Sequence, residues 1–224
     1  MSMLTYNLGN RIEAFTTDRT IGRKIPGVVY PHQTHTDKIY AISSDFFLLS
    51  LTERKAALEG VDALISDAKN IIMGISTADC IPVIVYDPVH HAAAAIHAGW
   101  KGTRLRIVSK TLQEMQKVYD TNPSDCAAAI GPGISQDSFE VGQEVVDAFV
   151  EAGFEMTDYV IMKKKPHIDL KALNKYQLTS MGVKDENIIV SDIDTFTNVD
   201  YFSARREQHG DIKCGRILSG FMLK

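Results

Sequence analysis

Short apolar runs separated by turn-forming residues dominate the first half of the chain. Six of them have the length and the β-branched content of strands, and they cover residues 27–30, 38–43, 63–66, 71–76, 81–86 and 92–97. Two further runs, around 188–190 and over 217–223, have the same character. The pattern therefore predicts a protein whose core contains at least one β-sheet.

Apolar residues recur at helical spacing in three longer segments. The first extends from Thr103 to about Tyr119, and the second spans 141–152 and stops at Gly153. The third opens at Asp169, a natural N-cap, and ends at Gly182. Because strands cluster early and helices later, we expect mixed α/β layers rather than a regular alternation of strand and helix.

Composition narrows the class of protein. The 224 residues suit one domain, and 45% apolar and 23% charged residues are ordinary for a globular core. A net charge of −4 argues against a nucleic-acid partner or a basic membrane-binding surface. The first residues lack the features of a signal peptide, and no apolar run is long enough to span a membrane. Three cysteines, an odd number in a chain of this length, argue against a disulfide scaffold and for a reducing compartment. We expect a cytoplasmic protein.

The chemistry of the chain is concentrated between residues 60 and 103. If the strands 81–86 and 91–97 form a hairpin around Asp87 and Pro88, their open ends bring Cys80 next to His97. The pair admits three interpretations: a thiolate–imidazolium nucleophile, part of a metal site, or a buried cysteine and a core histidine without a function.

Two more histidines follow the predicted strand at 27–30. His35 supplies a third candidate ligand, and three protein ligands leave the fourth position of a tetrahedral zinc site open to water, as in catalytic sites. His32 is better explained as a supporting residue, because a fourth protein ligand would close the site. His90 and His91 fall at the expected hairpin turn, where solvent exposure is the simplest expectation.

An anion site is predicted beside His97. Gly99 and Gly102 allow close backbone approach, Thr103 is a candidate N-cap for the helix that follows, and Lys101 adds a positive charge. Near the C-terminus Arg205 follows aromatic residues and offers a guanidinium suited to phosphate. The alternative explanation for residues 99–103 is a turn that merely enters a helix, and the alternative for Arg205 is a solvated surface arginine.

Seven motifs occur in an order that is typical of one known family. They are HQTH at 32–35, VDAL at 61–64, TADCIPV at 77–83, HAGWKG at 97–102, IGPGI at 130–134, FEVG at 139–142 and FSARR at 202–206. From about Ala14 onward the chain resembles the multicopper polyphenol oxidoreductase (laccase) family. Members of that family are also described as purine nucleoside phosphorylases and, in bacteria, as peptidoglycan editing factors.

The resemblance carries several expectations. It implies a four-layer α/β/β/α fold over residues 1–224 as a single catalytic domain, with zinc or copper held by His35, Cys80 and His97. It also implies phosphorolysis of adenosine, inosine, guanosine and methylthioadenosine, together with adenosine deaminase activity. The expected partners are small-molecule purine nucleosides and phosphate, bound by a monomer or homodimer, with Lys101 and Arg205 as candidate phosphate ligands.

Departures from the family pattern keep alternatives open. The loop that usually precedes Pro26 is shorter here, and Lys101 stands where arginine is common. A metal-free Cys–His hydrolase or deamidase with Cys80 as nucleophile is one alternative. A second alternative is a copper site with Met73 as axial ligand. A third is a peptidoglycan-precursor editing factor that binds a nucleotide-sugar peptide.

Overall fold

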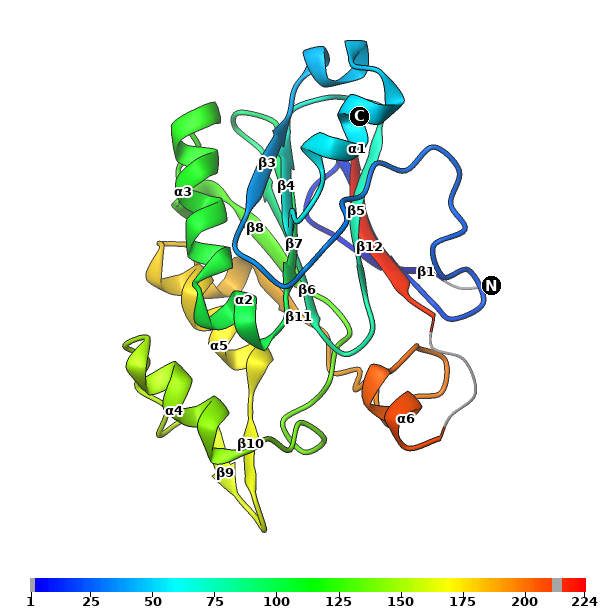
Figure 1. The fold of residues 1–224 in the computed structure, drawn as a ribbon. Helices are drawn as coiled ribbons and strands as arrows, with labels where there is room; N and C mark the ends of the chain where they lie inside the picture. Colours follow the sequence, from blue (N-terminus) through cyan, green and yellow to red (C-terminus); the bar gives the residue numbers. More distant parts are fainter. Residues whose placement is uncertain (1–2, 211–214) are drawn as a thin grey trace.

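Two β-sheets stacked face to face form the centre of the molecule (Figure 1). The computed structural model describes residues 3–210 and 215–224. The first sheet is antiparallel throughout and has four strands in the order β1-β2-β12-β5. Its members are β1 (Met3–Tyr6), β2 (Ile12–Thr17), β12 (Ile217–Leu223) and β5 (Ile72–Thr77).

The second sheet is mixed and has six strands in the order β11-β8-β6-β7-β4-β3. They are β11 (Ile188–Val190), β8 (Ala127–Ile130), β6 (Ile81–Asp87), β7 (Ala92–Ala98), β4 (Ala63–Ser66) and β3 (Ile39–Ile42). The two outermost pairs are parallel and the inner pairs antiparallel. Both β6 and β7 are buried along their whole length, because each lies in the middle of a sheet that is covered on both faces.

The described residues form six α-helices, and only some of them cover the outer face of the six-stranded sheet. The helices are α1 (Leu51–Ala57), α2 (Trp100–Arg104), α3 (Ile107–Tyr119), α4 (Gln143–Glu151), α5 (Leu170–Ser180) and α6 (Ala204–Gln208), and a small hairpin joins β9 (Val160–Met162) to β10 (Pro166–Ile168). In Figure 1 α2, α3 and α5 lie against this sheet, whereas the loop 18–30 and α6 lie on the side of the four-stranded sheet. None of the described helices combines the length and hydropathy needed to cross a membrane.

Strand alternation divides the apolar residues between two cores. In β7, Ile96 and Ala98 face the helices, while Ala93 and Ala95 face the other sheet. Successive side chains of a strand point to opposite faces, so one strand can contribute to both cores. The consequence is a rigid support whose strand ends, rather than its faces, are available for a site.

Most predicted elements are confirmed. The mixed α/β single-domain class holds, and the runs at 63–66, 81–86, 92–97, 188–190 and 217–223 form strands close to the expected limits. Asp169 caps α5, with its side chain accepting a hydrogen bond from the Ala172 N–H at 2.9 Å. Strands β1, β2, β8, β9 and β10 were not predicted; β8 is largely alanine, which has little strand preference of its own.

Two predictions of local structure are wrong. Residues 27–30 form no strand, only a bridge from Val29 to Met73, because the segment continues as a loop toward the site. The helix expected from Thr103 begins instead at Trp100 and is interrupted at Arg106, whose φ of 62° is left-handed. Thr103 is therefore a buried helical residue and not an N-cap: Gly99 occupies that position.

Candidate metal centre

The hairpin β6–β7 brings Cys80 and His97 together as predicted. Ile81 pairs with Ala98 and Pro82 with His97, so Cys80, directly before β6, lies at the open end of the hairpin. His35 enters from the loop that precedes β3. The candidate ligand atoms of His35, Cys80 and His97 all lie within 4.8 Å of one another, and the two imidazole centroids are 4.9 Å apart.

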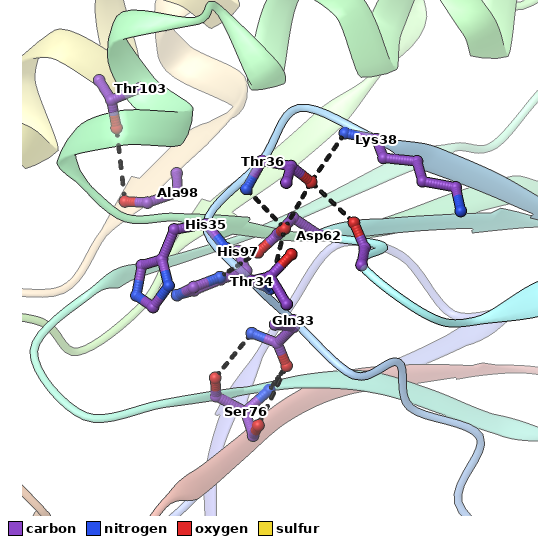
Figure 2. Close-up of polar contacts among 11 residues, drawn as sticks. Gln33, Thr34, His35, Thr36, Lys38, Asp62, Ser76, His97, Ala98 and Thr103 are labelled. Carbon is purple, nitrogen blue, oxygen red and sulfur yellow. Dashed lines mark hydrogen bonds and ion pairs between the residues drawn. The ribbon is translucent and has the colours of Figure 1, made fainter. Parts of the chain in front are cut away.

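One buried carboxylate, Asp62, organises both histidines (Figure 2). Its Oδ1 accepts a hydrogen bond from His97 Nδ1 at 2.6 Å and from the backbone N–H of His35 at 3.1 Å. Its Oδ2 accepts from the backbone N–H groups of Thr34 and Thr36 and from the Thr36 hydroxyl. With Nδ1 engaged by Asp62, the other ring nitrogen of His97 remains for a ligand.

The loop that carries His35 is held in an unusual conformation. His35 has a φ of 63°, which costs a residue other than glycine roughly 1–2 kcal/mol. Gln33, two residues earlier, compensates by three hydrogen bonds to Ser76 of β5: it donates to the Ser76 carbonyl at 2.9 Å and accepts from the Ser76 N–H at 2.8 Å and from its hydroxyl at 3.0 Å (Figure 2). The strained backbone persists because Asp62 and Ser76 fix it from two sides.

Cys80 and His97 each shift the pKa of the other. Burial raises the pKa of the Cys80 thiol, but the charge of His97 and hydrogen bonds from His35 and His97 outweigh it and lower the pKa to about 6. Burial lowers the pKa of His97, but the Cys80 thiolate and the Asp62 carboxylate raise it to about 9. Without a metal the pair therefore favours a thiolate beside an imidazolium, and a thiolate is both a nucleophile and a soft metal ligand.

Gly99 makes room for this arrangement. A Cβ at position 99 would lie 2.8 Å from Cys80 Sγ and 3.2 Å from His35 Cδ2. The backbone of Gly99 itself is ordinary, with a φ of −69°, so the requirement for glycine is steric. Two imidazoles, one thiolate and a carboxylate that orients one of the imidazoles match the donor set of a zinc site with an open position.

His35, Cys80 and His97 line a cavity of about 640 Å³. Its volume falls within the roughly 300–1,000 Å³ typical of small-molecule sites. Trp100 and Phe139 contribute aromatic surface, and Arg23, Arg205 and Arg216 contribute guanidinium groups. The cavity therefore combines apolar and positively charged walls next to the Cys–His–His group.

The structure separates the two predicted phosphate ligands. Arg205 lines the cavity, and its guanidinium carbon lies 5.7 Å from the centre of the Phe139 ring. Lys101 is exposed on α2, with its ammonium 5.8 Å from the centre of the Trp100 ring, and it is not among the described residues that line the cavity. Lys101 stays a prediction.

Other candidate residues fall outside the ligand group. His32 lies at the edge of the cavity, but its ring is exposed and its Nδ1 contacts Glu59 Oε1 at 2.7 Å. Met73 is fully buried in the core between the sheets, which leaves no support for its role as an axial copper ligand. His90 and His91 lie at the far turn of the hairpin, where His90 pairs with Asp87 at 2.9 Å and His91 bonds the Tyr86 hydroxyl.

Several cavity residues were not identified from the sequence. Arg23, Phe139 and Arg216 come from three segments far apart along the chain, and no spacing pattern links them to Cys80. Asp79, the residue before Cys80, is a further case. It proves to be 9% exposed, with its carboxylate engaged by the segment 195–205.

Fold and site together define a mixed α/β protein with a Cys–His–His centre at the end of a two-sheet sandwich. The chain belongs to the multi-copper polyphenol oxidoreductase laccase family, whose model matches residues 11–224.

Two relatives of the chain have names that state an activity. A purine nucleoside phosphorylase of Bacteroides thetaiotaomicron is 46% identical over 200 residues, which cover 88% of this chain and 73% of the relative. Adenosine deaminase RL5, from an unknown prokaryotic organism, is 39% identical over 208 residues, with 91% and 78% coverage. The crystal structure of the hypothetical protein YfiH of Bacillus licheniformis superposes with a TM-score of 0.86 at 26% identity, covering 100% of this chain and 97% of that one.

Proposed function

We propose that this protein is a zinc-dependent enzyme of purine nucleosides. It would convert adenosine, inosine, guanosine and methylthioadenosine with phosphate into the base and the ribose 1-phosphate, and would also deaminate adenosine. The observation that carries the proposal is the convergence of His35, Cys80 and His97 within 4.8 Å on the wall of a 640 Å³ cavity. The names of two relatives, a purine nucleoside phosphorylase and an adenosine deaminase, supply the reaction classes.

His35, Cys80 and His97 are the residues that would hold the zinc ion. Asp62 keeps the proton of His97 on Nδ1 and so leaves the second ring nitrogen for the metal. When bound, zinc with three protein ligands supplies Lewis-acid chemistry and the means to activate water at neutral pH. That chemistry suits the exchange of the purine 6-amino group for oxygen, with release of ammonia.

Phosphorolysis requires a second element, a cation that holds phosphate. In this reaction a phosphate oxygen forms a bond to ribose C1′ while the bond from C1′ to the purine nitrogen breaks. Arg205 supports the role because a guanidinium binds phosphate through two parallel hydrogen bonds and because this side chain lines the cavity. Trp100 and Phe139 offer surfaces against which a planar base can pack.

Turnover of inosine and adenosine, each with and without phosphate, tests the proposal. Inosine should yield hypoxanthine and ribose 1-phosphate only when phosphate is present, whereas adenosine should yield inosine in either buffer. Zinc should be found at about one ion per chain by mass spectrometry, and a chelator should abolish both reactions. Free ribose from inosine without phosphate, at an undiminished rate, would show a hydrolase instead.

Cysteine variants separate the metal centre from the core. Cys80→Ala should lose the zinc while the thermal transition is retained, because the two hydrophobic cores do not include Cys80. Cys126→Ala is the matched control: Cys126 is buried in the helix-side core, so its loss should reduce stability and leave the zinc content unchanged. Full zinc occupancy in Cys80→Ala would contradict the ligand assignment.

The thiolate–imidazolium pair also favours a second candidate, a metal-free Cys–His hydrolase or deamidase. Activity that survives the chelator but is abolished by iodoacetamide would select this candidate. Binding of a nucleotide-sugar peptide without nucleoside turnover would select an editing factor. A cytoplasmic location belongs to the proposal, because a reducing compartment keeps a thiol such as Cys80 free for a metal.

A further inference from the structure

Asp79, the neighbour of Cys80, ties the beginning of β6 to a distant part of the chain. Its Oδ1 accepts a hydrogen bond from the Thr195 hydroxyl at 2.7 Å. Its Oδ2 accepts from the Ser203 hydroxyl at 3.0 Å and from the backbone N–H of Arg205 at 2.7 Å. Both carboxylate oxygens are therefore committed to the segment that carries Arg205.

A main-chain bond from the same residue fixes a second wall of the cavity. The carbonyl of Asp79 accepts from the N–H of Ile134 at 2.8 Å, at the start of the loop that leads to Phe139. Phe139 in turn lies beneath the guanidinium of Arg205 at 5.7 Å from the ring centre. Asp79 thus holds the backbone of Arg205 and, through this loop, the ring on which the Arg205 side chain rests.

The two neighbouring arginines of α6 have different environments. Arg206 points into the protein, where its Nη1 donates to the carbonyls of Thr195 and Phe196 at 2.9 and 2.8 Å. Arg205 lines the cavity instead. A small rotation of this one-turn helix would redirect Arg205, and the hydrogen bonds of Asp79 to Ser203 and Arg205 oppose that rotation.

We propose that Asp79 is a positioning residue for phosphate: its carboxylate fixes the start of α6 so that Arg205 faces the cavity beside the Cys80–His97 pair. The inference rests on the proposed function, in which Arg205 holds phosphate. The role depends on hydrogen-bond acceptors and does not require a negative charge. An asparagine can accept from Ser203 and Arg205 with its oxygen and donate to the Thr195 hydroxyl with its amide.

Two substitutions at this position isolate the hydrogen bonds. Asp79 has a φ of 79°, a conformation that glycine and asparagine tolerate, so neither Asp79→Gly nor Asp79→Asn adds backbone strain. Asp79→Gly should raise the KM for phosphate on the order of tenfold, with a smaller change in kcat at saturating phosphate. Asp79→Asn should restore most of the loss. The zinc affinity, measured by competition with a chelator, should stay within about twofold in both variants.

A double-mutant cycle with Arg205→Ala decides whether Asp79 acts through Arg205. The phosphate KM of Asp79→Gly with Arg205→Ala should equal that of Arg205→Ala alone. An independent further rise would overturn the inference, as would a loss of zinc affinity in both Asp79 variants, which would make Asp79 a support for Cys80.

The cycle also separates this inference from the proposed function. A raised KM in Arg205→Ala with an unchanged KM in Asp79→Gly overturns the role of Asp79 alone. An unchanged KM in Arg205→Ala removes the phosphate role of Arg205, and the role of Asp79 falls with it.

Discussion

Replacing Asp62 by asparagine tests how the metal centre is organised. The carboxylate accepts five hydrogen bonds, from the N–H groups of Thr34, His35 and Thr36, the Thr36 hydroxyl and His97 Nδ1. Oδ1 accepts from His35 and His97, and Oδ2 accepts from Thr34 and Thr36, so an asparagine must replace one of these two oxygens by its NH₂. The set containing the Thr34 and Thr36 N–H groups cannot reverse, so the NH₂ should turn toward His97 and the His35 N–H.

The expected loss follows from that geometry. A donor facing His97 Nδ1 stabilises the tautomer with its proton on Nε2, the nitrogen that the metal requires. Loss of such a supporting contact lowers metal affinity on the order of 10–100-fold, or about 1.4–2.7 kcal/mol. The backbone N–H of His35 would then face another donor, and the loss of this part-buried hydrogen bond should reduce the free energy of unfolding by about 0.5–1.5 kcal/mol.

Zinc affinity and thermal stability are measured together on Asp62→Asn and on Asp87→Asn. Asp87 is an equally buried carboxylate that pairs with the ring of His90 at 2.9 Å and with two backbone N–H groups, at the other end of the hairpin. Its variant should lose comparable stability and retain its zinc affinity. A folded Asp62→Asn protein with a zinc Kd within twofold of the original would refute the reasoning.

Three further predictions concern the same site. His35→Ala should lower zinc affinity and turnover severely, whereas His32→Ala should be milder because the His32 ring is exposed and pairs with Glu59; equal effects in chelator titrations would argue that both ligate. Gly99→Ala should weaken zinc binding without loss of helix, since its Cβ would lie 2.8 Å from Cys80 Sγ; unchanged affinity would mean that the thiol can move aside. In the metal-free protein the lowered pKa of Cys80, about 6, keeps the thiolate present above that pH. The rate of alkylation by iodoacetamide should therefore stay constant from pH 8 to about 6.5 and fall below pH 6. The alkylation of an ordinary thiol, with a pKa near 8.5, already slows below pH 8.

Local patterns in the sequence determined much of the framework and the centre of the site. Apolar runs predicted the strands β4, β6, β7 and β12, because burial on both faces requires continuous apolar sequence. The hairpin of β6 and β7 placed Cys80 beside His97 for the same local reason: two equal strands around a short turn must meet at their open ends.

The tertiary structure alone decided which distant groups serve that centre. Asp62 reaches His97 because β4 lies beside β7 in the sheet, and Arg205 reaches the cavity because Asp79 binds the start of α6 across more than 100 residues of chain. Such contacts depend on strand order and loop packing, which leave no periodic trace in the sequence. Lys101, four residues after the predicted ligand His97, is instead exposed on α2 outside the cavity lining, because the direction of a side chain is set by the helix that carries it.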